Sequence, residues 1–395
     1  MARQCLAPLF PLALAALLGA CGVQRDASSP VDAGSPRQDA ADAGAAVHAV
    51  VQVRYPAGTH TLTLRGSAPP LDWNAGLAGT RGGDDLWTFD LGELPAPLEL
   101  KPLLDDTTWS PGPNSVVHPG ETLQLAPHFQ ATTGHVVLQW PAFPSRVLGN
   151  DRPVWVYLPP GYAENPYARY PVLYLHDGQN LFDAAQSFGG TEWRVDEALD
   201  EGSHALARDA ALRELLVVGV GNTAARVDEY TVDRDDSVGA GGRGALYLQF
   251  LVSELKPQVD AAFRTRPGRE DTAVGGSSLG ALISLHAGLR HPTVFGRVMA
   301  MSPATWWNGQ SVLAHVAASQ GQPLRPARLY LDSGDSGPSN DDAANTAALA
   351  DALRAVGYED GVDFRYVLAA GASHTESAWA ERLPAALRFL YPLQS

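Results

Sequence analysis

The sequence predicts an α/β fold with a mostly parallel central sheet and helices on both faces, preceded by a small β-sandwich domain. From residue 145 on, short apolar runs alternate with helix-like segments, which is typical of strands buried on both faces. Between residues 47 and 129, strand-like runs are separated by turn clusters and no helical period intervenes. The chain has 395 residues, too many for one ordinary domain, so we expect two.

The elements of the C-terminal domain, 145–395, follow from these runs. The predicted strands are Pro153–Leu158, Pro171–His176, Leu215–Val220, Thr272–Gly275, Gly296–Met301, Arg328–Asp332 and Asp363–Leu368. The predicted helices are Arg194–Leu199, Ala245–Ala262, Leu279–Leu289, Asn345–Val356 and Trp379–Leu390. A further strand, His135–Trp140, lies in the Pro-containing crossover between the two domains.

The N-terminus reads as an export signal followed by a tether. Arg3 precedes an apolar run, Leu6 to Leu18, that is too short to span a bilayer. The run ends in Leu18-Gly19-Ala20-Cys21, which resembles the lipobox of bacterial lipoproteins, and that resemblance implies lipidation of Cys21 after cleavage of 1–21. A plain secretory signal is the alternative. Residues 22–46 lack large apolar side chains and predict a disordered linker.

The composition excludes several functions. The net charge of −15, with no basic run, argues against nucleic acid and against electrostatic binding to anionic membranes, so a lipid anchor is the only membrane contact expected. The two cysteines are Cys5 and Cys21, which leaves no disulfide or thiolate metal site in the mature protein. No cluster of histidines and carboxylates has ligand spacing, so we expect no metal and no cofactor.

Residues 47–130 carry four motifs in an order that resembles a starch-binding-type carbohydrate-binding module. They are Arg65-Gly66-Ser67 with Leu71-Asp72-Trp73, Leu86–Phe89, Leu98–Lys101 and Trp109–Asn114. The resemblance implies that Trp73 and Trp109 stack on sugar rings while Lys101 and Asn114 bind hydroxyls. The alternative is that both tryptophans fill the small core. Trp87, inside a strand, is expected in that core.

The stretch Asp271–Gly288 contains the sequence pattern G-x-S-x-G at Gly276, Ser278 and Gly280. An apolar strand precedes it and a helix follows it. A serine at so sharp a turn needs small residues two positions away on each side, because strand and helix come close there. The turn exposes the hydroxyl and leaves the amide of Leu279 free at a helix N-terminus, where it can stabilise an oxyanion. We therefore predict Ser278 as a nucleophile.

A serine nucleophile needs a base, and in the α/β-hydrolase order the histidine comes last. His374 sits in a loop after the last predicted strand, where this fold places its base. With an ordinary pKa of about 6.5, histidine accepts a proton near neutral pH. His286 and His291 lie on or just beyond the helix that follows Ser278, so we expect them to point away from the site.

The acid that orients the base is predicted in the loop after strand Arg328–Asp332. Asp335 lies at the turn and is the predicted acid. Asp332, Asp341 and Asp342 are the alternatives, since Asp332 ends the strand and the other two can cap the next helix.

The second oxyanion donor is predicted in the loop Leu175–Asp183, after the third strand of the fold. Gly178 would let the backbone approach the substrate there, and the amide of Gln179 is the predicted donor. His176 and Asp177 are expected to position the loop.

Five separated motifs resemble the putative esterase family, which includes esterase D and hydrolases similar to enterochelin and feruloyl esterases. They are Tyr174–Asp183, Gly221–Thr231, Gly276–Gly280, Ser302–Trp307 and Gly371–Trp379. The resemblance covers residues 145–395 and implies a serine carboxylic-ester hydrolase without cofactor. The sequence departs from the family in the acid loop, where Gly337 stands at the position that often carries the acid.

Four further residues follow strand ends at the edge where α/β proteins bind ligands. We expect Arg226, Glu229, Trp306 and Trp307 to line the substrate cleft. The alternative is an Arg–Glu surface pair and two core tryptophans.

The sequence thus predicts a lipid-anchored envelope esterase acting on a small-molecule or polysaccharide ester, with acetyl, feruloyl and siderophore esters as candidates. A glycan bound by the N-terminal domain is the second expected partner. Two other functions stay open, namely an acyltransferase of the same fold and a carbohydrate-binding lipoprotein without activity.

Overall fold

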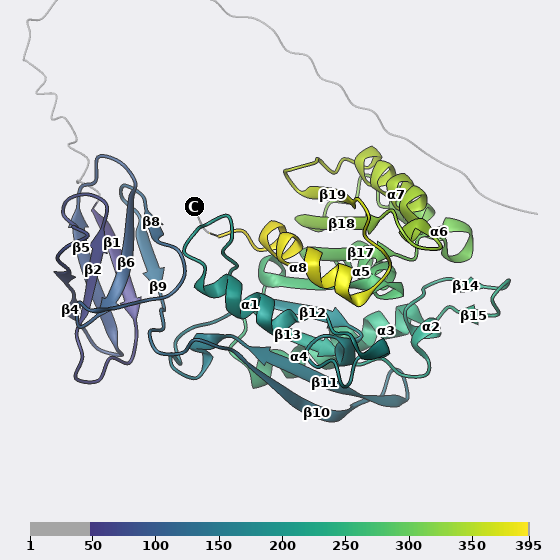
Figure 1. The fold of residues 1–395 in the computed structure, drawn as a ribbon, viewed down its shortest axis with the longest axis horizontal. Helices are drawn as coiled ribbons and strands as arrows, with labels where there is room; N and C mark the ends of the chain where they lie inside the picture. Colours follow the sequence, from purple (N-terminus) through teal and green to yellow (C-terminus); the bar gives the residue numbers. More distant parts are fainter. Residues whose placement is uncertain (1–47, 394–395) are drawn as a thin grey trace, which may run out of the picture. The chain divides into compact units, whose positions relative to one another are not determined.

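The structure is a computed structural model that describes residues 48–393 (Figure 1). The predicted export signal, the linker and Cys21 lie outside the described residues. Across 48–393, none of the helices combines the length and the apolar character that a membrane span requires.

Two small β-sheets and a core of their own form the N-terminal part. One sheet has the order β4-β5-β1-β9, from Thr80–Arg81, Leu86–Gly92, Ala49–Arg54 and Thr122–Leu125. The other has the order β3-β2-β6-β7, from Leu77–Ala78, Leu62–Gly66, Leu98–Leu104 and Thr108–Trp109, with β8 (Ser115–Val117) paired to β6. One hydrophobic cluster takes side chains from both sheets, including Val51, Leu64 and Trp87. Trp87 is therefore a core residue, as predicted.

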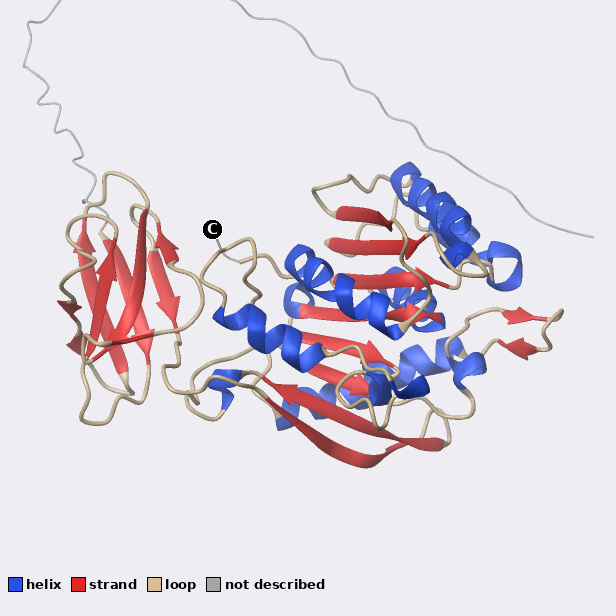
Figure 2. Ribbon diagram, in the orientation of Figure 1, coloured by secondary structure: helices blue, strands red, loops and turns tan. Residues whose placement is uncertain are grey.

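The C-terminal part is built on an eight-stranded sheet with the order β10-β11-β13-β12-β16-β17-β18-β19 (Figures 1 and 2). These strands are His135–Ser145, Asn150–Leu158, Leu216–Val220, Val172–His176, Thr272–Ser278, Arg297–Pro303, Arg328–Gly334 and Phe364–Ala369. The pairs from β13 to β19 are parallel, and β10 and β11 add an antiparallel edge. All eight predicted strands are present.

Alternate residues of the strands feed two cores, one on each face of the sheet. One face is covered by α1 (Val195–His204) and α8 (Glu376–Leu390). The other face is covered by α3 (Gly244–Phe250), α4 (Lys256–Ala262), α5 (Leu279–Arg290), α6 (Trp307–Ala318) and α7 (Ala343–Ala355). The parallel sheet with helices on both faces agrees with the predicted fold class.

Three features differ from the prediction. The predicted helix Ala245–Ala262 contains a π-turn, Leu251–Leu255, between α3 and α4. The sequence did not predict α6, whose first turn has left-handed residues at 308–310. Nor did it predict the short α2 (Arg226–Glu229) and the hairpin of β14 (Arg234–Asp235) and β15 (Ala240–Gly241). Single-turn helices occur at Pro160–Tyr162, Gly178–Asn180, Phe188–Gly190, Arg269–Asp271 and Asn340–Asp342.

Candidate active site

Ser278 stands at the junction of β16 and α5 with a strained backbone. Its φ of 56° and ψ of −125° lie outside the regions that L-residues prefer. A Cβ on Gly276 would lie 3.0 Å from the carbonyl carbon of Gly280, so small residues are required on both sides, as the spacing predicts. Leu279 is the first residue of α5, and its amide has no acceptor within the helix. The turn therefore presents a partly exposed hydroxyl beside a free backbone donor.

His374 pairs with Asp341 and not with the predicted Asp335. The Nδ1 of His374 lies 2.5 Å from Oδ1 of Asp341, whose side chain is fully buried. Asp335 is exposed, and its Oδ1 accepts a 2.6 Å hydrogen bond from the amide of Gly371. The prediction of Asp335 as the orienting acid is wrong, because its exposed side chain binds the backbone amide of Gly371 in the loop that carries His374 and does not bind the imidazole.

The backbone of the acid loop turns Asp341 inward. Residues 340–342 have φ values of 48°, 49° and 55°, three left-handed residues in succession. The second oxygen of Asp341, Oδ2, accepts hydrogen bonds from Gly334 N at 2.5 Å and Ser302 Oγ at 2.6 Å. Burial raises the pKa of Asp341, but its bonds to His374, Ser302 and Gly334 outweigh burial and hold the pKa below the ordinary value. Asp341 is therefore ionised beside an imidazole that donates from Nδ1.

The other two alternatives serve different partners. Asp332 is buried at the end of β18 and binds the guanidinium of Arg382 through both oxygens, at 2.9 and 3.1 Å. Asp342 accepts from the amide of Trp306 at 3.2 Å and from Asn345 at 2.7 Å, at the start of α7. Neither replaces Asp341 as the partner of His374.

One strand separates Ser278 from the Asp341–His374 pair. Ser278 is the register partner of Pro303 at the end of β17, and its carbonyl accepts from Ala304 at 3.1 Å. The next residue back, Ser302, is the one that binds Asp341. No hydrogen bond joins the Ser278 hydroxyl to His374 in the part of the chain that the structure describes. Such contacts are often long in hydrolases without substrate.

The predicted oxyanion loop bends at Asp177, which is left-handed (φ 57°, ψ 47°) and precedes the turn Gly178–Asn180. Gln179 lies within that turn, partly exposed, and its side-chain oxygen accepts from the amide of Asn222 at 3.3 Å. A Cβ on Gly178 would lie 2.5 Å from the carbonyl carbon of Gly219, so packing on β13 by itself requires a glycine here. The approach of this backbone to the substrate stays a prediction.

Asp177 and Arg226 form a bidentate ion pair beside this loop. Nε and Nη2 of Arg226 donate to the two carboxylate oxygens at 2.7 and 2.8 Å, and Asn222 adds a 2.6 Å bond to Oδ1. His176 is buried and bonds Tyr247 at 2.9 Å. Burial lowers the pKa of His176 to about 3, so its imidazole is neutral near pH 7 and is too weak a base to take a proton there. Arg226, predicted to line the cleft, is thus committed to holding the oxyanion loop.

Glu229 does not line the cleft as predicted, because it is fully buried. It pairs with Arg152 of β11 at 3.0 Å and accepts from Asn150 at 2.7 Å. The guanidinium of Arg152 also lies over the rings of Tyr247 and Phe250. The Arg152–Glu229 pair ties α2 to the antiparallel edge of the sheet.

The two tryptophans after β17 separate in role. Trp307 is buried, and its indole N–H donates to the carbonyl of Asp233 at 2.8 Å, so it belongs to the core and not to the cleft. Trp306 is 50% exposed, and its amide is bound by Asp342 on the acid loop. Trp306 is the one of the pair that can meet a ligand.

In the N-terminal part, the four predicted sugar-binding residues differ in exposure and in hydrogen-bond partners. The rings of Trp73 and Trp109 lie 6.2 Å apart at 40°, and Trp109 is 41% exposed. Lys101 is buried and donates to the carbonyl of Gly112, and burial lowers its pKa. Asn114 donates its amide to Glu99 at 2.9 Å. Both tryptophans are at least partly exposed, whereas Lys101 points to the interior and the amide of Asn114 is bound to Glu99.

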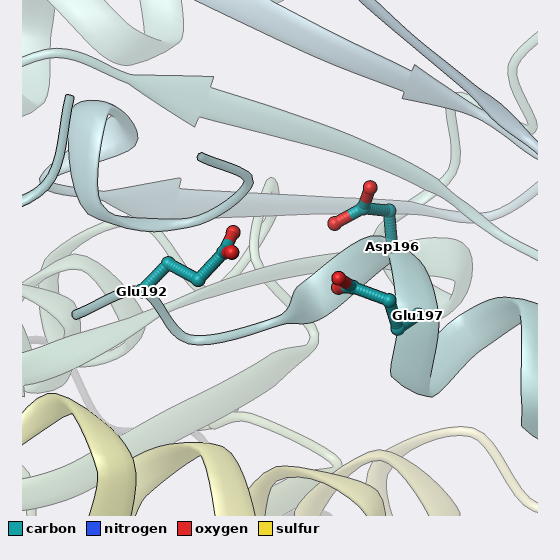
Figure 3. A group of neighbouring side chains, drawn as sticks. All are labelled: Glu192, Asp196 and Glu197. Atoms are coloured by element: carbon teal, nitrogen blue, oxygen red, sulfur yellow. The ribbon is translucent and has the colours of Figure 1, made fainter. Parts of the chain in front are cut away.

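Glu192, Asp196 and Glu197 bring three carboxylates together before and at the start of α1 (Figure 3). Within residues 48–393 this is the one group of three side chains whose oxygens, within 4.8 Å of one another, could hold a metal ion. Burial and the neighbouring charge of Glu197 raise the pKa of Asp196 to about 7. The first turn of a helix favours negative charge, which accounts for the position of Asp196 and Glu197 without a ligand.

This cluster makes stability depend on pH. The folded chain holds the Asp196 proton up to about pH 7, whereas the unfolded chain releases it near the ordinary pKa of 3.8. The unfolded state therefore binds fewer protons between these values, and stability falls as pH rises through them. Asp196→Asn is expected to raise Tm by roughly 3 °C at about pH 8 and hardly at all at about pH 4.

Differential scanning calorimetry across this pH range measures the effect. The matched control is Glu381→Gln, which removes an exposed carboxylate from α8. Its change in Tm should not depend on pH. An equal change for Asp196→Asn at both pH values would contradict the assignment.

The comparison with protein families agrees with the fold of the C-terminal part. Residues 145–390 match the family model described as "Putative esterase". This match defines the class of protein as a carboxylic ester hydrolase. The chain belongs to the putative esterase family, as its motifs predicted.

Several known proteins are similar to parts of the chain. YbbA of Bacillus subtilis, an uncharacterized protein, is 26% identical over 193 residues, 47% of this chain and 68% of YbbA. The endo-1,4-β-xylanase/feruloyl esterase of Xylanibacter ruminicola is 26% identical over 45% of this chain and 23% of that protein. The iron(III) enterobactin esterase of Dickeya dadantii is 29% identical over 43% of this chain and 33% of that enzyme.

Among solved structures, the BES protein from Bacillus cereus superimposes with a TM-score of 0.53 at 22% identity, covering 67% of this chain and 97% of that one. At this level of identity, the likeness shows the fold. The match covers less than two thirds of the length of each of the two esterases named above.

Proposed function

We propose that the chain is a serine esterase whose triad is Ser278, His374 and Asp341. The observation that carries the proposal is the strained Ser278 at the strand-to-helix turn, one strand away from a buried carboxylate bonded to His374. Ser-His-Asp sites are recognised by geometry and roles, and these are the residue types and the chain order that the fold requires.

The reaction follows from this arrangement. Ser278 Oγ attacks the ester carbonyl while His374 Nε2 takes the hydroxyl proton, and the amides of Leu279 and Gln179 bind the oxyanion. The C–O bond to the alcohol then breaks, and the alcohol leaves with the proton from Nε2. Water attacks the acyl-enzyme by the same steps in reverse order, which releases the acid and restores Ser278. Asp341 stays ionised throughout and stabilises the imidazolium.

For the substrate, we propose an ester of a hydroxylated carrier, either a feruloyl or acetyl group on a polysaccharide or a siderophore ester. Two relatives carry feruloyl esterase and enterobactin esterase in their names. The exposed Trp306, bound to the acid loop, offers an aromatic surface for either an aryl group or a sugar face.

Hydrolysis of p-nitrophenyl esters from acetate to octanoate by residues 47–395 tests the proposal, beside Ser278→Ala and His374→Ala. We expect each variant to lose roughly 10³-fold or more in kcat/KM. A fluorophosphonate probe should label wild type and not Ser278→Ala. Absence of labelling in folded wild type would favour the carbohydrate-binding lipoprotein without activity.

For the N-terminal part, we propose glycan binding through the Trp73–Trp109 pair. Stacking on an exposed indole contributes about 1 kcal/mol or more per ring, so Trp109→Ala is expected to weaken binding of β-cyclodextrin at least about fivefold. Calorimetric titration measures the affinity, with Leu206→Ala, a change at an exposed apolar residue outside the N-terminal part, as the control. If titration of wild type with β-cyclodextrin and with maltoheptaose shows no heat of binding, the glycan proposal fails.

We also propose export and lipid anchoring through Cys21, which rests on the lipobox-like Leu18-Gly19-Ala20-Cys21. Cys21→Ala in a bacterial host should move the chain from the membrane fraction to the soluble envelope fraction. An unchanged distribution would leave a plain secretory signal as the better account.

A further inference from the structure

Behind Asp341 lies a buried polar cluster that the proposed reaction does not use. It consists of Ser302, Asp332, Trp379 and Arg382, from β17, β18 and α8. None of the four is exposed by more than 8%. Burying so many polar groups is costly unless all are paired, so the arrangement calls for an explanation.

The hydroxyl of Ser302 is the centre of this cluster, and its bonds determine where its proton points. Trp379 Nε1 donates to Oγ at 3.0 Å, and Arg382 Nη2 donates to it at 2.9 Å. A serine hydroxyl has two lone pairs and one proton. Since both lone pairs are taken by N–H donors, the one proton is left for Asp341 Oδ2, 2.6 Å away. Ser302 is therefore a donor to Asp341.

The hydroxyl also stands between a cation and the acid. Arg382 Nη2 lies 3.9 Å from Asp341 Oδ2, too far for a hydrogen bond, and the guanidinium is bound instead by both oxygens of Asp332. The Asp332–Arg382 pair is neutral as a whole. Asp341 is thus a buried negative charge without an arginine of its own. The cation that completes it is the imidazolium that forms on His374 during the reaction.

We infer that Ser302 is a positioning residue that keeps Arg382 off Asp341 and thereby reserves the charge of Asp341 for His374. This inference rests on the proposed triad. The backbone supports it, because Ser302 has a left-handed φ of 45° and its amide is bound by Asp332 Oδ1 at 3.1 Å. Trp379 connects Ser302 to the base. It donates to the Ser302 hydroxyl, and its ring packs edge-on against the His374 imidazole with ring centroids 4.9 Å apart.

Other charged groups lie near the base and near Asp332. Burial raises the pKa of Asp342 on the acid loop and of Glu376 on α8, and the charge of nearby His374 acts in the opposite direction on both. Asp177 and Arg226 act on Glu376 from the oxyanion loop, and Tyr330 lies beside Asp332. None of these residues is altered in the variants below, so a change in pH profile is traced to the cluster itself.

The test is the pH profile of kcat/KM for p-nitrophenyl acetate in Ser302→Ala. Without the hydroxyl, Arg382 is free to move onto Asp341, and the neutralised acid stabilises the imidazolium less. We expect the acidic limb to move down by about one pH unit and kcat to fall about tenfold, with KM within about twofold because Ser302 does not touch substrate.

Two matched variants separate this role from a merely structural one. Ser333→Ala removes a buried hydroxyl that has no hydrogen-bond partner in the described chain, one residue beyond Asp332, and its profile should overlay wild type. Ser302→Cys keeps a side-chain atom between the Arg382 guanidinium and the Asp341 carboxylate. The acidic limb of its pH profile should therefore stay near that of wild type, even though a thiol is a weak donor. It also serves if Ser302→Ala does not fold.

The outcomes are distinct. If Ser302→Ala lowers Tm but leaves the acidic limb in place, Ser302 is structural only and the inference is overturned. The same holds if Ser302→Cys moves the limb as far as alanine. The inference about Ser302 can fail while the proposed function stands, namely if Ser278→Ala still abolishes ester hydrolysis. If Ser278→Ala hydrolyses as fast as wild type, the proposed function falls and the inference falls with it.

Discussion

Asp341→Asn is expected to lower kcat/KM on p-nitrophenyl acetate by about 10³-fold or more. The amide keeps the size of the side chain but removes the charge that stabilises the His374 imidazolium. It also offers an N–H where the carboxylate accepts, so His374 takes the tautomer that leaves Nε2 protonated and unable to accept from Ser278. The loss should appear in kcat, because Asp341 is fully buried and does not reach substrate.

Asp335→Asn is the matched control, with the same chemical change on the same loop. Its side chain is exposed and caps the amide of Gly371, so activity should stay within about twofold of wild type. A large loss in Asp335→Asn together with an active Asp341→Asn would restore the original prediction of the acid. Circular dichroism and Tm of both variants exclude unfolding as the cause.

Glu229→Gln is expected to destabilise the chain by about 3–5 kcal/mol, a fall in Tm of roughly 10 °C. The carboxylate is fully buried against Arg152, and its removal leaves a guanidinium charged in a site closed to water. Urea unfolding followed by fluorescence measures the change. Near-wild-type kcat at a temperature where the variant is folded would agree with a role outside the cleft.

The double variant Arg152→Met with Glu229→Gln controls for packing. It removes both charges and keeps a long side chain over Tyr247 and Phe250, so it should be more stable than Glu229→Gln alone. Additive losses in the double variant would argue against a coupled ion pair. A specific loss of kcat/KM in Glu229→Gln with unchanged Tm would return this residue to the cleft.

The strands of the parallel sheet could be predicted because each contains a short apolar run between turn signals, as in Val172–His176 and Leu216–Val220. Helix α6 could not. Its start reads Trp307-Asn308-Gly309, a turn signal, and the chain does adopt left-handed conformations there before the helix continues. The turn-forming residues at its start therefore concealed the helix that follows them.

The proposed nucleophile Ser278 and the proposed base His374 could be selected from the sequence because their surroundings are local, one in a spaced glycine motif and the other in the loop after the last strand. The acid could not be chosen, because what distinguishes Asp341 from Asp335 is burial, which depends on three left-handed residues, on the nearby amide of Gly334 and on the distant hydroxyl of Ser302. The same applies to Glu229. Its partner Arg152 lies 77 residues earlier, and nothing in the local sequence indicates that pair.

Asp341, the proposed acid, also connects two strands of the sheet. One of its two oxygens, Oδ2, joins the ends of β17 and β18 by accepting from Ser302 and Gly334, and neither hydrogen bond involves a substrate. A descendant that lost its chemistry would therefore have reason to keep Asp341 while Ser278 and His374, both accessible to solvent, could change freely. In comparing relatives, an aspartate at this position is evidence of the fold, and only the serine and the histidine are evidence of an enzyme.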